Sequence, residues 1–487
     1  MSEATASVNA DATEIVFHSA ELEAGTFLVL GATATERLSG LFEIEVHLAL
    51  DDEIPLDEDT VYRVLHAPAA LALGASGEAH APWFGVLREI ELVSAVRDRR
   101  ALYRAVLVPS LWYLGQTVRS RVFQNESVPD IVAAVLEETG VAFERALNET
   151  YPVREHVVQY QESDLDFVSR LCEHEGIFFF FDHTSGSDVV VLADHNGAFR
   201  EAAQPEVPFD ARGDARVDHT VLTAIRRAWR VVPQHVILRD TNYRIPQTPL
   251  QATHAVDEAQ GLGLVSLYGD HFKDEAEGNR LARVRAEERA LQGHLCYAET
   301  VAAPLRPGQS FTLSGHPTFD AFDVEYVVVA SRHRLYASGD EGAPVELELL
   351  PKSIPFRPAR VTRKPRIYGL MHARIDGETD STLAPIDEQG RYKVLLPFDE
   401  AGAVGGRASR WIRRAQPYAG PNYGMHYPLH IGAEVVLAHL DGDPDRPIIV
   451  GAVPSPATSS PVIDELATRS IVRTKGRIVE EYEDDAR

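Results

Sequence analysis

Apolar and polar residues alternate along much of this chain, with the period of two that is typical of half-buried β-strands. In FEIEVHLAL at 42–50, Phe42, Ile44 and Val46 fall on the same face as the two later leucines. FDVEYVVV at 322–329 alternates in the same way. The likeness between the two segments suggests an internal duplication of one barrel, although alternating strands also resemble one another by chance. The pattern predicts a mainly β protein with few helices.

Two segments are expected to form helices. Ser127 is a good N-cap for a helix that carries four apolar residues and stops at Gly140. A second helix is expected over about 275–291, which is rich in Glu, Arg and Ala.

A third helix is predicted inside YQESDLDFVSRLCEHEGIFFFFDH at 160–183. Ser163 caps it, and Asp166 three residues later resembles a capping box. Gly176 ends it, and a core strand of four consecutive phenylalanines follows at once. Its expected apolar stripe is Leu165, Val168, Leu171 and Cys172.

Beyond a basic linker near 355–366, the sequence indicates a second kind of domain. The linker holds Arg357, Arg360, Arg363, Lys364 and Arg366, which we expect to meet acidic neighbours, the axis of an assembly or solvent. Five short strand signals follow: IYGLMHARI, RYKVLLPF, SRWIRRAQPY, GAEVVLAHL and PIIVGAVP. Five such strands in about 90 residues predict a small barrel of the OB type. The final stretch SIVRTKGRIVEEYEDDAR reads as one more strand.

Length and composition narrow the classes of protein. The 487 residues predict about three domains and an ordinary soluble composition. The N-terminus lacks a basic and an apolar region, which indicates synthesis in the cytoplasm without a Sec signal. A net charge of −26 repels phosphate and disfavours general binding of nucleic acid or anionic membrane. Cys172 and Cys296 are expected to be buried thiols.

Acidic clusters supply the first candidates for chemistry. Glu173, His174 and Glu175 begin like the zinc-protease motif HExxH, but no second histidine follows. We therefore expect a solvated acidic helix end. DGDPDRP at 441–447 has the first three acids of a calcium loop, Asp441, Asp443 and Asp445, but neither the glycine nor the glutamate that should follow. A rigid turn is expected there.

The last candidates lie in the region of the small barrel. His426 and His430 are four residues apart, but Pro428 between them argues against a helix and hence against a metal site. Arginines surround Trp411, with Tyr418 and Tyr423 nearby, which is the kind of surface on which OB barrels bind single strands. The arginines are Arg407, Arg410, Arg413 and Arg414. We predict no catalytic, cofactor-binding or metal-binding residue.

Several long motifs, in a fixed order, resemble a known family. The segment at 160–183 is similar to part of VgrG, the valine-glycine repeat spike proteins of type VI secretion systems. So are LVPSLWYLGQTVRSRVFQNESVPDIVAAVLEETGV at 107–141 and LRPGQSFTLSGHP at 305–317. GMHYPLHIGAEVVLAHLDGDPDRPIIVGAV at 424–453 is similar to the OB domain of that family and of contractile-phage spikes. The resemblance covers about 14–475.

The resemblance implies a domain order. A disordered N-terminus at 1–13 would precede a phage-hub-like domain at 14–360, built from two β-barrels with intervening helical segments. An OB spike-base domain at 361–455 would follow, and 456–487 would form the neck and the start of a β-prism truncated in this chain. Three copies would assemble around one axis. If the two barrels are duplicates, three chains would present six barrels to a six-fold tube.

The resemblance also implies a mechanical role and no enzymatic activity. The chain would puncture target membranes at the tip of a contractile machine and deliver effectors. Its implied partners are the haemolysin-coregulated protein tube, a PAAR-repeat cap, effectors and baseplate proteins, without nucleic acid or stable membrane insertion. It would assemble in the cytoplasm and then be secreted. The alternatives are the spike-hub of an extracellular injection system or a phage tail and, more remotely, an OB nucleic-acid binder or a cell-wall glycan hydrolase.

Overall fold

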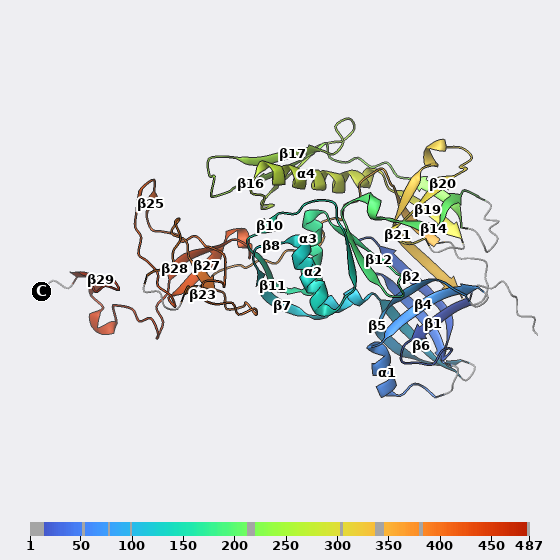
Figure 1. The fold of residues 1–487 in the computed structure, drawn as a ribbon, viewed down its shortest axis with the longest axis horizontal. Helices are drawn as coiled ribbons and strands as arrows, with labels where there is room; N and C mark the ends of the chain where they lie inside the picture. The colour runs from blue at the N-terminus through green and yellow to red at the C-terminus, as the bar shows by residue number, and fades with distance from the viewer. Residues whose placement is uncertain are drawn as a thin grey trace, which may run out of the picture. The chain divides into compact units, whose positions relative to one another are not determined.

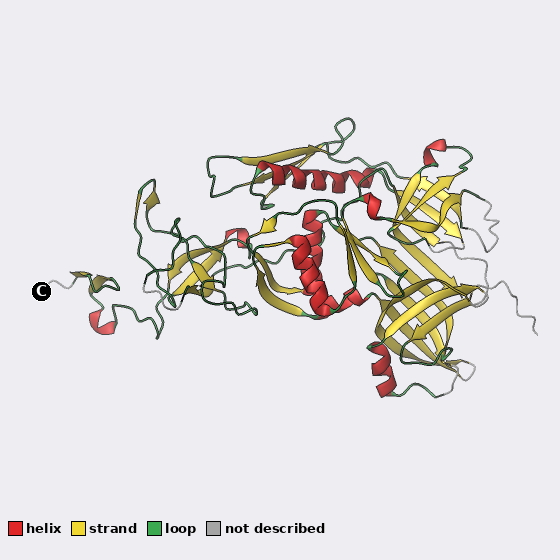
Figure 2. Ribbon diagram, viewed as in Figure 1, coloured by secondary structure: helices red, strands yellow, loops and turns green. Residues whose placement is uncertain are grey.

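Strands dominate the fold and helices are few, so the predicted class, mainly β with a few helices, is confirmed (Figures 1 and 2). The computed structural model describes residues 14–50, 54–75, 78–97, 100–211, 220–301, 305–336, 345–378 and 383–484. The expectation for 1–13 lies outside this part of the chain.

Contacts divide the chain into two units. The first comprises Met1–Thr117, Val128–Tyr151 and Asp164–Thr362, and the second comprises Val118–Ser127, Pro152–Ser163 and Arg363–Arg487. The backbone therefore passes between the units at five places. The predicted domain boundaries stay predictions, but no pattern in the sequence indicated the two short segments that join the second unit.

Six strands form the first barrel of the first unit. They are β1 (Glu14–Ser19), β2 (Phe27–Arg37), β3 (Glu43–Leu50), β4 (Pro68–Ala75), β5 (Glu78–Arg97) and β6 (Arg100–Val108). Their hydrogen-bonded order is β1-β4-β5-β6-β3-β2, and β1 contacts β2 on the remaining side. Ile44, Val46 and Leu48 point into the apolar interior, as the alternation predicts. Helix α1 (Glu58–Leu65) contributes the buried Val64 to the same core.

Six further strands form the second barrel. They are β14 (Arg200–Pro208), β15 (Val221–Arg227), β19 (Cys296–Val301), β20 (Gln309–Ser314), β21 (Glu325–Tyr336) and β22 (Val345–Pro351). Around the barrel the order is β21-β22-β19-β15-β14-β20, and β20 pairs again with β21. The Asp210 backbone N–H donates to the Leu222 carbonyl over 2.9 Å and links the end of β14 to β15. That the two barrels superpose stays a prediction.

The prediction for 322–329 is only partly correct. Strand β21 begins at Glu325, while Phe322 lies in a 3-10 turn and Val324 is 37% exposed. From Tyr326 onward both faces are buried, because Tyr326 and Val328 fill the barrel and the alternate valines fill a neighbouring core. A strand buried on both faces loses the alternation of a half-buried one.

One antiparallel ladder joins the two barrels. Residues 31–37 of β2 pair with residues 330–336 of β21, so the twelve strands form a single sheet. The other edge of β2 pairs with β3 and that of β21 with β22, which makes β2 and β21 members of both the ladder and their own barrels. We call this ladder the seam.

The four phenylalanines form a core strand beside the seam, as predicted. Strand β12 (Phe178–Asp182) pairs with β13 (Val189–Ala193), which pairs with β9 (Phe143–Ala146). Helices α2 (Val128–Thr139) and α3 (Asp164–Glu175) pack against each other, and their ends confirm the predicted caps and stops within one residue (Figure 1). Gly176 has a φ of 80°, the left-handed conformation that ends many helices.

The third helix packs on a separate small sheet. Helix α4 (Glu275–Ala290), capped by Asp274, agrees with the prediction for about 275–291. It lies along strands β16 (His235–Asp240) and β17 (Leu250–Ala255), and β18 (Leu264–Tyr268) is the remaining strand of this sheet (Figure 1). Val236, Leu238 and Leu281 belong to their common core.

The second unit contains the small barrel. Its sheet has the order β24-β23-β27-β28, formed by β23 (Met371–Asp376), β24 (Lys393–Leu395), β27 (Glu434–His439) and β28 (Pro447–Ala452). The strand expected in SRWIRRAQPY is reduced to two bridges, Tyr392 with Ile412 and Arg414 with Ile449, which connect the two edges of the sheet. In RYKVLLPF, Tyr392, Val394 and Leu396 are buried on one face, as predicted.

Three further strand pairs belong to the second unit. They are β7 (Val118–Phe123) with β11 (Val157–Ser163), β8 (Glu126–Ser127) with β10 (Val153–Arg154), and β25 (Ala419–Gly420) with β26 (Tyr423–Gly424). The prediction of a single final strand is wrong, because β29 (Arg469–Arg473) and β30 (Val479–Glu483) form a hairpin. Residues 474–478 turn the chain, with Arg477 at a φ of 67°.

We predict that Gly308→Ala destabilises the first unit by about 2–4 kcal/mol in free energy of unfolding. Gly308 has a φ of 89°, and an added Cβ would lie 2.3 Å from the Phe180 ring. Gly315→Ala is the matched control, because Gly315 has a φ of 77° and nothing within 4 Å of the added atom. Urea unfolding gives the free energy of unfolding of both variants, and the difference between them reports the steric contact with Phe180. Equal losses in the two variants would contradict that contact.

Candidate functional site: a buried ionic network around Glu173

The acidic end of α3 is buried, so the expectation of a solvated helix end is wrong. The Glu173 carboxylate accepts hydrogen bonds from the backbone N–H groups of Val361 and Thr362, both over 3.0 Å, and from the Thr362 hydroxyl over 2.7 Å. Glu173 is 7% exposed because Val361 and Thr362 of the basic linker cover it. A sequence pattern on α3 alone does not contain this covering segment, which lies almost 190 residues away.

Glu175 and His174 are held by partners from other elements. The Glu175 side chain is fully buried, and its Oε2 lies 2.5 Å from a guanidinium nitrogen of Arg280 on α4. His174 Nε2 lies 3.0 Å from the carbonyl oxygen of Asp270. The Asp270 carboxylate in turn binds Arg360 over 2.8 Å. Burial is the largest single influence and raises the pKa of Asp270, but Arg360, His174 and Arg285 together outweigh it, so the pKa of Asp270 is lowered overall.

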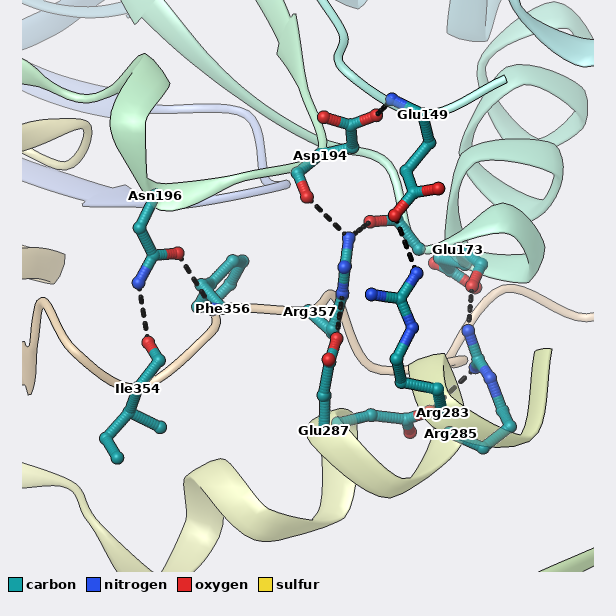
Figure 3. A network of polar contacts seen from close by, with 12 residues as sticks. Glu149, Glu173, Asp194, Asn196, Arg283, Arg285, Glu287, Ile354, Phe356 and Arg357 are labelled. Carbon is teal, nitrogen blue, oxygen red and sulfur yellow. Dashed lines mark hydrogen bonds and ion pairs between the residues drawn. The ribbon is translucent and has the colours of Figure 1, made fainter. Parts of the chain in front are cut away.

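Two buried arginines, Arg285 of α4 and Arg357 of the basic linker, bind backbone carbonyl groups at the C-terminal end of α3 (Figure 3). Arg285 donates to the Glu173 carbonyl oxygen over 2.5 Å and to the Glu288 carboxylate over 2.7 Å. Arg357 donates to Glu287 over 2.6 Å and to the Gly176 carbonyl oxygen over 3.1 Å. These cations satisfy carbonyl groups that the end of a helix leaves without partners, where the helix dipole is negative.

Further contacts fix the segment that carries Arg357. The Arg357 guanidinium also donates to the Asp194 carbonyl oxygen over 2.7 Å. Asn196 donates to the carbonyl oxygen of Ile354 over 2.6 Å and accepts from the Phe356 backbone N–H over 3.0 Å (Figure 3). Part of the basic linker therefore meets acidic and polar groups of the chain itself, which was one of the predicted outcomes.

The network is built to hold segments together. Burial lowers the pKa of Arg285 to about 10, which still leaves the guanidinium charged at neutral pH. Burial raises the pKa of the Cys172 thiol to about 12, so this neighbouring thiol stays protonated. Each carboxylate of Glu173 and Glu175 is occupied by donors, and that arrangement favours a structural ionic clamp over acid–base chemistry.

A second buried polar group, which sequence reasoning missed, lies at the seam. Trp83 donates from its indole nitrogen to Glu36 over 2.8 Å, and the Arg306 guanidinium lies 3.8 Å from the Trp83 ring centroid. The His333 ring contacts the same indole edge-on at 5.6 Å. Glu36 and His333 belong to β2 and β21, the strands of the seam. The four residues are widely separated in the chain, so no local motif marks them.

Burial determines the protonation of this second group. It raises the pKa of Glu36, although the Arg306 cation opposes the shift. It lowers the pKa of Arg306 to about 10. Burial, together with the Arg306 cation, lowers the pKa of His333 and of the nearby His183 to about 3. Both histidines are therefore neutral in the folded protein at neutral pH.

The candidate metal ligands of the second unit either contact a cation or an aromatic ring of the chain or lie in a turn. Asp441 lies in the turn between β27 and β28, as expected, and Asp443 and Asp445 both bind the Lys364 ammonium, at 2.8 and 2.7 Å. His426 stacks on Tyr392, whereas His430 lies 3.4 Å from the Lys475 ammonium. The chain around these histidines has no helix, as Pro428 predicts.

The aromatic and cationic residues near Trp411 do not form one surface of basic side chains that are open to a ligand. The Lys393 ammonium lies 5.1 Å from the Trp411 ring centroid, and Arg414 donates to the Tyr427 carbonyl oxygen. Tyr418 and Tyr423 contact each other with ring centroids 5.2 Å apart. Both cysteines are buried and unpaired, as expected. Across the described ranges, no helix combines the length and apolarity that crossing a bilayer requires.

A fused pair of six-stranded barrels followed by a small barrel is the architecture of a tail-hub protein. The E. coli c3393 protein, described as a type VI secretion component with structural similarity to T4 tail proteins gp27 and gp5, has this fold. It superposes with a TM-score of 0.67 at 22% identity, covering 90% of this chain and 99% of that one.

The chain belongs to the phage tail baseplate hub (GPD) family, whose model matches residues 35–339. Residues 384–453 match the type VI secretion system/phage-baseplate injector OB domain, which confirms the predicted OB fold. The type VI secretion system spike protein VgrG1c of Pseudomonas aeruginosa is 33% identical over 434 residues, 86% of this chain. The resemblance to VgrG proteins is thereby confirmed.

The chain spans only part of the relatives that it matches. It covers 58% of the Pseudomonas spike protein. A Vibrio cholerae relative named actin cross-linking toxin VgrG1 is 28% identical over 78% of this chain but is covered over only 36% of its own length.

We predict that Arg357→Met lowers the free energy of unfolding by about 3–5 kcal/mol, because it leaves the partly buried Glu287 carboxylate and two carbonyl groups without the donor that the buried guanidinium supplies. The matched control is Arg37→Met, which breaks an ion pair of similar length, 2.8 Å, whose arginine side chain is 62% exposed. The control should cost less than about 1 kcal/mol. Denaturant titration compares the two, and equally small losses would contradict a clamp at the end of α3.

We also predict that acid destabilises the first unit through His183 and His333. Their pKa values are about 3 in the folded protein and about 6.5 in an unfolded chain, so the unfolded state binds more protons between these limits. Stability is therefore lost as pH falls from about 6.5 towards 3, by about 2 kcal/mol per histidine at about pH 5. His333→Phe should reduce the pH dependence of urea unfolding, whereas the exposed-site control His18→Phe should leave it unchanged. An unaltered dependence in His333→Phe would refute the assignment.

Proposed function

We propose that this chain is the hub and spike base of a contractile type VI secretion machine. The 33% identity to a type VI spike protein over most of the chain carries the proposal, together with the succession of hub and injector OB domains. In this role three copies surround one axis at the tip of the inner tube. Contraction of the machine then drives the tip through a target membrane and delivers effectors.

The ionic clamps support a mechanical role. Arg285, Arg357 and Glu175 are buried and bound at their charged ends, so each clamp resists separation of the segments that it joins. Breaking a buried ion pair leaves an uncompensated charge, which is far more unfavourable than separating an exposed pair. We propose a structural protein without enzymatic activity, and the toxin relative would owe its named activity to the part that this chain does not cover.

The proposed partners follow from the same role. The hub docks on the haemolysin-coregulated protein tube, and the segment that follows the OB domain supports a needle with a PAAR-repeat cap, effectors and baseplate contacts. Six barrels from three copies match a six-fold tube without an adaptor. The protein assembles in the cytoplasm and leaves the cell through the machine. A phage tail or an extracellular injection system is the second candidate, because the hub family and the OB model name phage baseplates too.

We predict that the purified chain forms a trimer. Light scattering across a concentration series should show a species near three times the chain mass of 53.7 kDa. The trimer should co-sediment with tubes of haemolysin-coregulated protein, and bovine serum albumin in place of the chain is the control for trapping. A chain that is monomeric at every concentration contradicts the trimeric hub. A trimer that does not co-sediment with the tubes contradicts the proposed docking.

A further inference from the structure

A cavity lies next to the buried group around Trp83. It has a volume of about 280 Å³ and is lined by the end of β12, the start of β14 and the loop that leads into β20. Four apolar residues, Pro82, Phe180, Phe181 and Pro307, contribute to its lining. An apolar protein cavity of about 150 Å³ holds a benzene molecule, so this cavity has room for a ligand with one ring.

His183 supplies the cavity with a buried donor that has no partner. The residue lines the cavity and is 9% exposed. Its Nδ1 accepts a hydrogen bond from the Phe84 backbone N–H over 3.2 Å. A neutral imidazole that accepts at Nδ1 carries its proton at Nε2. Among the residues that the structure describes, His183 Nε2 has no hydrogen-bond partner, so its N–H group is free to donate to a ligand.

The position and the protonation of this donor are fixed. The His183 ring contacts the Phe42 ring with centroids 5.6 Å apart and the Phe84 ring with centroids 6.2 Å apart. Burial, followed by the Arg306 cation, lowers the pKa of His183 to about 3, so the ring is neutral at neutral pH. Buried polar groups in folded proteins nearly always have a partner, because leaving one without a partner is unfavourable. The His183 donor therefore indicates that an acceptor binds next to it.

Two cations and two carboxylates line the cavity, so their formal charges cancel. The cations are Arg200 and Arg306, and the acids are Asp182 and Glu201. Arg200 is already bound to Glu144 over 2.7 Å and to Asp182 over 3.3 Å. A charged ligand would lose its hydration without meeting an opposite net charge in the cavity. The lining therefore favours an uncharged ligand that is mainly apolar.

We propose that this cavity binds a small, uncharged molecule with one ring and one acceptor oxygen. The oxygen accepts a hydrogen bond from His183 Nε2, and the ring packs against Phe180 and Phe181. The ligand contacts β12, β14 and the loop before β20 together, so its binding stabilises the folded first unit by mass action. The proposal goes beyond the hub and spike-base role and does not rest on it.

Acetophenone and ethylbenzene are matched probes for this site. They share a ring and a two-carbon substituent, and they differ in one carbonyl oxygen. Ligand-observed NMR titration of the whole chain measures the dissociation constant of each probe. Acetophenone should bind about fivefold more tightly than ethylbenzene or better, because only its oxygen satisfies the His183 donor. Acetophenone should also raise the midpoint of urea unfolding more than ethylbenzene does at the same concentration.

The variant His183→Phe keeps a ring beside Phe42 and Phe84 and removes the donor. In this variant acetophenone should bind no more tightly than ethylbenzene, while ethylbenzene keeps its wild-type affinity. A purely structural role of His183 would leave the ratio of the two affinities unchanged. The control is His18→Phe, at an exposed position of β1, which should keep the wild-type ratio. Circular dichroism compares the fold of each variant with that of the wild-type chain.

The wild-type chain gives a second readout that does not depend on a variant. In NMR spectra of the chain with isotope-labelled histidine, the Nε2–H signal of His183 should shift as acetophenone is added. Ethylbenzene at the same site leaves this donor without an acceptor and should shift the signal much less.

Three outcomes would overturn the proposal. Equal affinities of the two probes for the wild-type chain would show that the His183 donor is not used. A preference for acetophenone that persists in His183→Phe, with an unchanged His183 signal in the wild-type chain, would place the binding elsewhere. Failure of both probes to bind at millimolar concentration would mean that the cavity holds water only. A monomeric chain, by contrast, would contradict the trimeric hub and leave this proposal standing.

Discussion

The hydrogen-bonded ladder between β2 and β21 is the constraint on which the first unit depends. It converts two barrels into one continuous sheet, and its strands are also walls of those barrels. A shift of one residue in this ladder would turn the side chains of the shifted strand to the other face of the sheet. Glu36, if β2 shifts, or His333, if β21 shifts, would then leave the buried group at Trp83, and the apolar face of that strand's barrel would be exposed. The register of one strand pair thus fixes two cores.

Buried ion pairs hold further segments of the first unit together, in addition to the ladder between β2 and β21. Buried arginines hold the covering segment around Arg357, helix α4 and the end of α3 together, in addition to the apolar core that Phe356 and Leu291 share. Such pairs give modest net stability because both charges lose their hydration, but they resist the removal of either partner. They also specify one arrangement of segments, since each guanidinium requires acceptors at fixed positions. This property suits a protein whose proposed work is to bear load without changing shape.

Local patterns predicted a large part of this fold, and long-range contacts account for the rest. The alternation at 42–50, the end signals of α2 and α3 and the phenylalanine strand depend on neighbours in the chain, and the structure confirms them. The acidic end of α3 failed as a prediction because its covering residues, Val361 and Thr362, are remote in sequence. The strand predicted in SRWIRRAQPY does not form, because this segment makes one isolated bridge to each of the two edges of the barrel sheet. The group around Trp83 carries no local signal.

The five passages of the backbone between the two units have a consequence for how such a protein can be divided. Strands β7 and β11 of the second unit are encoded far upstream of its barrel, inside the sequence of the first. Ser120 donates its backbone N–H to Glu400, and Tyr160 packs on Phe398, so these strands are part of that unit's packing. A single cut of the gene near residue 362 would therefore separate the small barrel from four strands of its own unit, β7, β8, β10 and β11. An exchange between relatives that preserves the second unit has to carry these two upstream segments together with the barrel.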